Sequence, residues 1–171
     1  MTLSHKVQQM NKKILFLITE SDWGGAQRFL LEFLPELIKN YQNFEIIVAA
    51  GGKGFITEEL KRHGIDTIRL KSLTPKHFSP FSDFKAFFDI YALLKQEKPD
   101  VCFLLSTKAG FYGAWANFFF KLFNPEKPKV IYKIGGWAFT ERINWFRKIL
   151  YLWIEKMTVP LKDFIIVNSQ H

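Results

Sequence analysis

The sequence of 171 residues is poor in cysteine and has no long apolar run. The single cysteine, Cys102, excludes an internal disulfide, which fits a reducing compartment. Cys102 lies within a predicted buried strand, so we expect a small core residue rather than a nucleophile. No run reaches the roughly 18 apolar residues of a transmembrane helix, and residues 1–11 lack the apolar segment of a signal peptide. We therefore expect a cytoplasmic protein, with peripheral contact at the inner face of the membrane left open.

Several motifs of nucleotide, metal and hydrolase chemistry are also missing. The turn at Gly24-Gly25 lacks the pattern G-x-G-x-x-G, and the second predicted strand ends at Ala50 without an acidic residue for a ribose. The P-loop pattern G-x-x-x-x-G-K-[ST] and the G-x-S-x-G elbow of serine hydrolases are absent. The four histidines, at positions 5, 63, 77 and 171, have no zinc-ligand spacing. These absences argue against a dinucleotide-binding enzyme, a P-loop NTPase, a zinc protein and a serine hydrolase.

The composition is that of a folded chain with an aromatic and basic bias. Hydrophobic residues make up 48% of the sequence and aromatic residues 17%, including 19 phenylalanines. Such a surplus either fills a core or leaves apolar surface for a partner. The net charge of +8 favours anionic partners, namely a nucleotide, a nucleic acid or an acidic membrane surface. The alternative is a solvated basic surface.

Strand and helix signals alternate along the chain, after a polar N-terminal tail at residues 1–12. Apolar runs without polar alternation predict strands buried on both faces, as in a parallel sheet covered by helices. We predict an α/β domain at residues 13–171, doubly wound, with a mainly parallel sheet and helices on both faces. Pro35 interrupts the first helical pattern, where we expect a kink or a restart. The predicted strands are 14–19, 44–50, 67–70, 101–105, 129–134 and 164–167, and the predicted helices are 25–39, 55–63, 82–96, 108–123 and 141–157.

The paired glycines Gly24 and Gly25 stand between the first strand and the first helix. Glycine lets the backbone approach a ligand closely, because no Cβ intervenes. The N–H groups and the positive dipole end of the helix favour a phosphate or another anion. The alternative is that the glycines only form a tight turn.

Two further segments follow the fourth and fifth strands, and in an open α/β sheet ligands bind at the carboxyl ends of the strands. Ser106, Thr107 and Lys108 offer two hydroxyls and an ammonium for sugar hydroxyls or a phosphate. We also expect Ser106 or Thr107 to cap the following helix. After the fifth strand come Gly135, Gly136 and Trp137, where Trp137 either stacks on a sugar ring or is a buried aromatic on a tight turn. We expect these turns to converge on one crevice with residues 21–25 and 51–54.

The last predicted helix, 141–157, is amphipathic and basic. Core packing is the simplest interpretation of its apolar stripe. A second interpretation is a basic, aromatic helix resting on an anionic membrane. The stripe consists of Ile143, Phe146, Leu150, Trp153 and Met157.

These segments, in this order, resemble the N-terminal domain of glycosyltransferase family 4. That family has the GT-B architecture, in which two Rossmann-like domains face a cleft. The resemblance covers about residues 13–169. The matching stretches are ITESDWGGAQRFLLEFLPEL, FEIIVAAGG with HGID, KPDVCFLLSTKAGFYGAWA, KVIYKIGGWAFTE and EKMTVPLKDFIIVNS.

The resemblance implies a hexosyltransferase of polysaccharide biosynthesis that moves a sugar from a nucleotide-sugar, with retention of configuration, to a glycan or lipid-linked acceptor. It implies no metal and no other cofactor. Gly24 and Gly25 would lie beside the donor diphosphate, Ser106–Lys108 would face the acceptor, and Gly135–Trp137 would lie close to the transferred sugar. Positive charge and helix dipoles would stabilise the departing diphosphate.

The sequence departs from the family in two respects. Gly135 and Leu105 stand where the family often has histidine, which points to a different acceptor, altered activity or none. Nothing matches the C-terminal domain that holds most of the donor, so we expect this acceptor-side half to be inactive alone. Its partner would be a donor-binding domain in cis or in trans.

The alternative function is a non-catalytic module that binds anionic lipid or a glycan. Nucleic-acid binding is a weaker third hypothesis, because the basic residues are spread out and no recognition helix is evident.

Overall fold

The computed structural model describes residues 12–19, 23–41, 43–52, 54–73, 80–125, 128–135 and 145–167. A six-stranded sheet forms its centre, with the strand order β3-β2-β1-β4-β5-β6 and every neighbouring pair parallel. This order reverses direction at β1, as in doubly wound nucleotide-binding folds. The predicted α/β, Rossmann-like fold is confirmed. The strands are β1 (Lys12–Ile18), β2 (Phe44–Ala50), β3 (Asp66–Arg69), β4 (Val101–Leu104), β5 (Lys129–Ile134) and β6 (Phe164–Val167).

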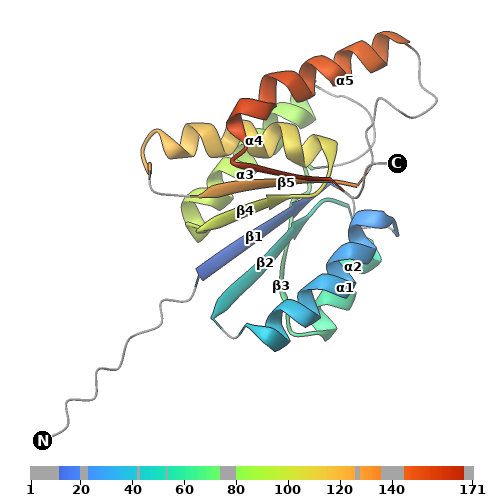
Figure 1. The fold of residues 1–171 in the computed structure, drawn as a ribbon, viewed down its shortest axis with the longest axis vertical. Helices are drawn as coiled ribbons and strands as arrows, with labels where there is room; N and C mark the ends of the chain where they lie inside the picture. The colour runs from blue at the N-terminus through green and yellow to red at the C-terminus, as the bar shows by residue number, and fades with distance from the viewer. Residues whose placement is uncertain are drawn as a thin grey trace, which may run out of the picture.

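Helices cover both faces of the sheet (Figure 1). Helices α1 and α2 lie on one face, and α3, α4 and α5 lie on the other. From β1 the chain first builds the sheet toward β3 and then, from β4, toward β6. Because the connections between parallel strands are right-handed, the helices of these two halves lie on opposite faces. The helices are α1 (Gly25–Asn40), α2 (Phe55–Arg62), α3 (Pro80–Glu97), α4 (Thr107–Lys121) and α5 (Trp145–Thr158), with a short 3-10 helix, η2 (Val159–Leu161).

The side chains of β1 alternate between two cores. Leu15 and Leu17 pack with residues of α3 and α4, whereas Phe16 and Ile18 pack with residues of α1 and α2. All four are at most 1% exposed. Burial on both faces explains why the strand reads as an uninterrupted apolar run.

Two sequence predictions about packing are wrong, those for β6 and for the apolar stripe of α5. Of the two alternatives expected at Pro35, a kink or a restart, the restart does not occur, because helix α1 continues through this residue. Leu30 and Leu34, which lie in the turn of α1 before Pro35, are fully buried. Their tertiary packing outweighs the loss of the backbone hydrogen bond that a proline cannot donate. Strand β6 is not buried on both faces, because its four side chains are 41–60% exposed and it forms the edge of the sheet beside β5.

The second wrong prediction concerns the apolar stripe of α5. Phe146, Trp153 and Met157 are 65%, 63% and 52% exposed, so they do not pack in the core. The helix instead buries polar residues, Glu155 and Thr158, against the rest of the domain. The side chain of Leu150 and the whole of Ile143 lie outside the described part of the chain. Among the described helices, none combines the length and the apolar character needed to cross a membrane.

Candidate functional site

The carboxyl ends of four adjacent strands, β2, β1, β4 and β5, meet at one edge of the sheet. Thr19, Gly51, Ser106 and Gly135 stand at or just beyond these ends. These strand ends therefore meet at one edge of the sheet, as predicted, and that they line one crevice stays a prediction. Gly136 and Trp137, like residues 20–22, lie outside the described part of the chain.

Ser106 links two of these strand ends. Its Oγ accepts a hydrogen bond from the backbone N–H of Thr19 at 3.1 Å and forms a short hydrogen bond with Thr19 Oγ1. The same oxygen accepts the N–H of Ala109 at 3.4 Å, so Ser106 is the N-cap of α4 and the predicted cap is confirmed. Thr107 is the first residue of that helix. Sequence reasoning missed Thr19, because its contact with Ser106 joins positions 87 residues apart.

Lys108 lies in the first turn of α4 and forms an ion pair with α3. Its Nζ is 2.8 Å from Oδ1 of Asp83, and the two side chains are 12% and 8% exposed. The hydroxyl of Tyr112 hydrogen-bonds the same carboxylate, and burial followed by the charge of Asp83 raises the pKa of Tyr112. Asp83 was missed in the sequence, because only the fold brings the first turn of α3 beside that of α4.

The N-terminus of α1 is capped by Gly24, whose backbone is extended. A Cβ on Gly25 would meet nothing within 4 Å, so open space lies beside this residue. Close by in sequence, Trp23 is 68% exposed and makes an edge-to-face contact of 5.8 Å with Phe55, the first residue of α2. The edge therefore presents glycine-capped N-termini of two helices, since Gly54 caps α2. Both favour negative charge.

Two other glycines at this edge differ sharply in their surroundings. A Cβ on Gly51 would lie 1.5 Å from the carbonyl oxygen of Leu73 and 2.1 Å from that of Thr19. Gly51 thus allows three backbone segments to pack together. A Cβ on Gly135 would meet nothing within 4 Å, and this residue is exposed. Gly135 therefore leaves room beside the end of β5.

Cys102, the single cysteine, is not a candidate nucleophile. Cys102 is fully buried in β4, and burial raises the pKa of its thiol to about 12. The thiol stays protonated at neutral pH, which confirms its prediction as a core residue. Within the described residues, no group of three or more His, Cys, Asp or Glu side chains is arranged to hold a metal ion.

Comparison with known proteins identifies relatives of this chain. An uncharacterized 41.2 kDa protein in the cps region of Klebsiella pneumoniae is 37% identical over 102 residues, which are 60% of this chain and 28% of that protein. A UDP-Gal:alpha-D-GlcNAc-diphosphoundecaprenol alpha-1,3-galactosyltransferase of Escherichia coli is 29% identical over 134 residues, or 77% of this chain and 32% of the enzyme. The chain thus spans about a third of each curated relative.

The fold is shared with solved structures. The crystal structure of Anabaena Alr3699/HepE in complex with UDP and glucose superposes with a TM-score of 0.64 and 18% identity, over 93% of this chain and 39% of that one. A family model described as Glycosyltransferase Family 4 matches residues 23–171. The match covers most of the chain, including every strand end of the candidate site except Thr19. The chain belongs to glycosyltransferase family 4.

Proposed function

We propose that this chain is the acceptor-side half of a retaining glycosyltransferase. It moves a sugar from a nucleotide-sugar to a glycan or lipid-linked acceptor, and it needs a donor-binding domain, in cis or in trans, for turnover. The observation that carries the proposal is the glycine-capped start of α1 at the edge where Ser106 and Gly135 also lie. The related E. coli enzyme is named for a UDP-sugar donor and a diphosphoundecaprenol acceptor, and Alr3699/HepE was solved with UDP and glucose.

The roles of the residues follow from the chemistry of a departing nucleoside diphosphate. Gly24 and Gly25 let the phosphates approach the positive end of α1, which stabilises the leaving group without a metal. Thr107 and Ser106 face the acceptor. The hydroxyl of Ser106 is held in place by its hydrogen bond from the backbone N–H of Thr19. Lys108 also lies on the acceptor side, where its ammonium is paired with the carboxylate of Asp83. Gly135, beside which the space is open, leaves room for the transferred sugar. By the family resemblance, Gly136 and Trp137 would also lie close to that sugar.

Titration with UDP-galactose, followed by calorimetry, tests the donor site. Gly25→Ala adds a methyl group in open space, so the fold should be retained while the methyl group blocks the phosphate. We expect the affinity to fall about tenfold or more. Glu36→Ala, near the far end of the same helix, is the matched control and should bind normally. Unchanged affinity of the Gly25→Ala variant would contradict this role. Sugar transfer by the 171-residue chain alone would contradict the requirement for a second domain.

Peripheral membrane contact is a second proposal, which the outward apolar face of α5 favours. Trp145, Phe146, Leu152 and Trp153 are 39–65% exposed, whereas the buried side of the helix carries Glu155. A helix that turns aromatic side chains outward, with lysines beside them, suits the boundary of an anionic bilayer. The same face would serve a non-catalytic module that binds anionic lipid.

Flotation with phosphatidylglycerol vesicles tests this contact. We expect binding that weakens as salt rises, because adsorption of a chain with net charge +8 is partly electrostatic. The double variant Phe146→Ser, Trp153→Ser should lose binding. Tyr41→Ser, which removes a 59% exposed aromatic at the end of α1, is the control. Equal flotation of both variants, or no dependence on anionic lipid, would rule the contact out.

A further inference from the structure

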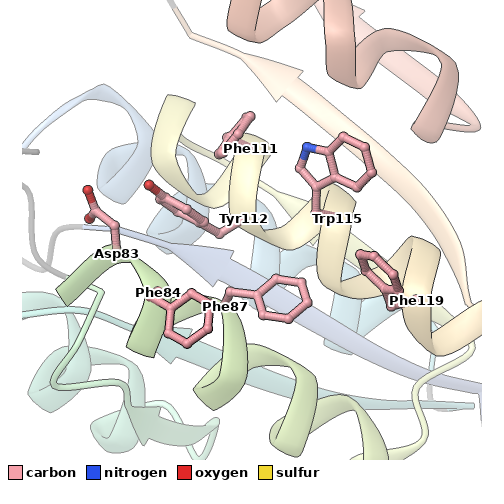
Figure 2. A pocket seen from close by; sticks show the side chains of 7 residues that line it. All are labelled: Asp83, Phe84, Phe87, Phe111, Tyr112, Trp115 and Phe119. Atoms are coloured by element: carbon pink, nitrogen blue, oxygen red, sulfur yellow. The ribbon is translucent and has the colours of Figure 1, made fainter. Parts of the chain in front are cut away.

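We infer that the groove between α3 and α4 holds the apolar chain of a lipid-linked acceptor, with the acceptor's polar head at the carboxyl edge of the sheet. This inference rests on the proposed function and names its acceptor class. The groove has a volume of about 530 Å³, and Figure 2 shows side chains from both helices lining it. The aromatic lining residues are Phe84, Phe87, Phe111, Tyr112, Trp115 and Phe119.

The rings form a connected aromatic path. Phe84 contacts Phe88 with 4.7 Å between ring centroids, and Phe88 contacts Phe87 at 5.2 Å. Phe87 reaches across to Phe119 on α4 at 5.8 Å, and Phe119 lies 6.2 Å from Trp115. Phe84, Phe88 and Phe119 are 67%, 48% and 42% exposed. Much of this path is therefore solvent-facing apolar surface, although Phe87 also packs against the core. Exposed apolar surface of this kind marks a binding site.

The groove is polar at one end. Asp83 lies at its edge end, paired with Lys108 and bonded to Tyr112. Both helices begin at that end, α3 at Pro80 and α4 at Thr107, and run away from the candidate site. From Phe111 to Phe119 the groove follows α4 for about 12 Å. An amphipathic ligand would thus place its head beside Ser106 and its chain along the helices.

The lining favours a hydrocarbon over a glycan. Beyond the edge end, the described lining residues are phenylalanines and Trp115, whose indole nitrogen is the one polar side-chain atom among them. A sugar there would lose hydrogen bonds with water without replacing them, whereas an isoprenoid chain loses none. At the head end the ammonium of Lys108 balances the carboxylate of Asp83. The N-terminus of α4, which has no acidic residue in its own first turn, favours the anionic diphosphate of such an acceptor.

Binding of two soluble prenyl diphosphates tests the inference. Farnesyl and isopentenyl diphosphate share the head and differ in chain length. We expect the 171-residue chain to bind the farnesyl compound at least about tenfold more tightly, because the longer chain buries more apolar surface. Phe84→Ser and Phe119→Ser should each reduce that preference. Phe123→Ser removes a 78% exposed ring outside the groove and is the matched control. Circular dichroism melts would establish that each variant is folded.

Three outcomes would overturn the inference. One is equal affinity for the two diphosphates, and another is a preference that Phe84→Ser leaves intact. The third is that another occupant uses the groove. This would appear as a concentration-dependent dimer that Phe84→Ser disrupts, or as binding to phosphatidylglycerol vesicles that depends on Phe84 and that farnesyl diphosphate does not displace. UDP-galactose titration of the same variants keeps the two proposals distinct, since equal affinity for the two prenyl diphosphates with normal donor binding would refute the groove alone.

Discussion

Lys108 and Asp83 form a nearly buried ion pair that fastens the start of α4 to the start of α3, with 2.8 Å between Nζ and Oδ1. The side chains are 12% and 8% exposed, so the pair is largely shielded from water. Removing one member of such a pair takes away the opposite charge that balances the other in a mostly buried site.

Lys108→Met is therefore expected to lower the free energy of unfolding by about 3 kcal/mol, and Asp83→Asn by a similar amount. Urea unfolding measures both. The double variant should lose less than the sum of the two, which is the signature of a direct interaction. Arg28→Met breaks an exposed pair with Glu32 and should leave the midpoint unchanged. Strict additivity in the double variant would show that the two residues act independently.

Gly51 provides a second stability test, because its neighbours are backbone atoms. Gly51→Ala would place a Cβ 1.5 Å from the Leu73 carbonyl oxygen, so the chain must shift at the sheet edge. We expect a loss of about 3 kcal/mol or more in unfolding free energy. Gly25→Ala adds the same methyl group into open space and should leave stability unchanged or slightly higher. Thermal melts compare the two. Equal melting temperatures would refute the close packing at Gly51.

The strands and helices were predictable because local pattern and tertiary burial agree. The run from Ile14 to Ile18 reads as a buried strand, since both of its faces are covered. The N-cap at Ser106 was equally readable, because its oxygen acts within its own helix. The predicted ends of these elements differ from the observed ones by a few residues at most in the described part of the chain.

The wrong and missed predictions have a common physical origin, because they depend on how elements far apart in the sequence pack together. An apolar stripe at helical spacing does not reveal whether it faces the core, and among the α5 residues whose burial is described, the buried ones are Glu155 and Thr158. The pairing of Lys108 with Asp83 and the groove beside it depend on how α3 and α4 pack, which no local pattern encodes. The roles of Gly24, Gly25 and Gly135 toward substrate stay predictions.

Asp163 predicts a dependence of stability on acid pH. Its Oδ2 accepts the N–H of Val130 at 2.8 Å and lies 2.8 Å from the Nζ of Lys121. Burial alone would raise the pKa of this carboxyl, but the hydrogen bonds from Lys121 and Val130 outweigh it, so the folded-state pKa is below the ordinary 3.8.

A carboxyl whose pKa is depressed by folding stabilises the protein above its unfolded pKa and loses that contribution as pH falls through the folded value. We expect the Asp163 contribution to be complete well above about pH 4 and to be lost as pH falls below that value. Asp163→Asn should lower stability at pH 7 by about 1–3 kcal/mol and flatten the decline at lower pH. Urea unfolding from pH 7 to pH 3 measures both. A variant whose decline parallels that of the parent would show that other groups cause it.

The attachment of α5 predicts a final effect, because it depends on a buried polar cluster. Lys162, whose side chain is 1% exposed, places its Nζ 3.0 Å from Oε2 of Glu155 and 3.8 Å from the centroid of the Tyr132 ring. The Tyr132 hydroxyl donates to the other oxygen of Glu155 at 2.8 Å. Burial lowers the pKa of Lys162, and the hydrogen bond to Glu155 opposes that shift. The carboxylate thus joins β5 and the segment before β6 to α5.

Lys162→Met would leave the Glu155 carboxylate buried and uncompensated, which should cost about 3 kcal/mol. Lys129→Met removes a 67% exposed lysine and is the control. Tyr132→Phe keeps the ring and removes one hydrogen bond, so its cost should be about 1 kcal/mol. Because Phe146, Trp153 and Met157 of α5 are largely exposed, amide hydrogen exchange in Lys162→Met should accelerate in α5 before β1. If exchange accelerated equally in α5 and β1, the cluster would stabilise the whole domain rather than hold this helix in place.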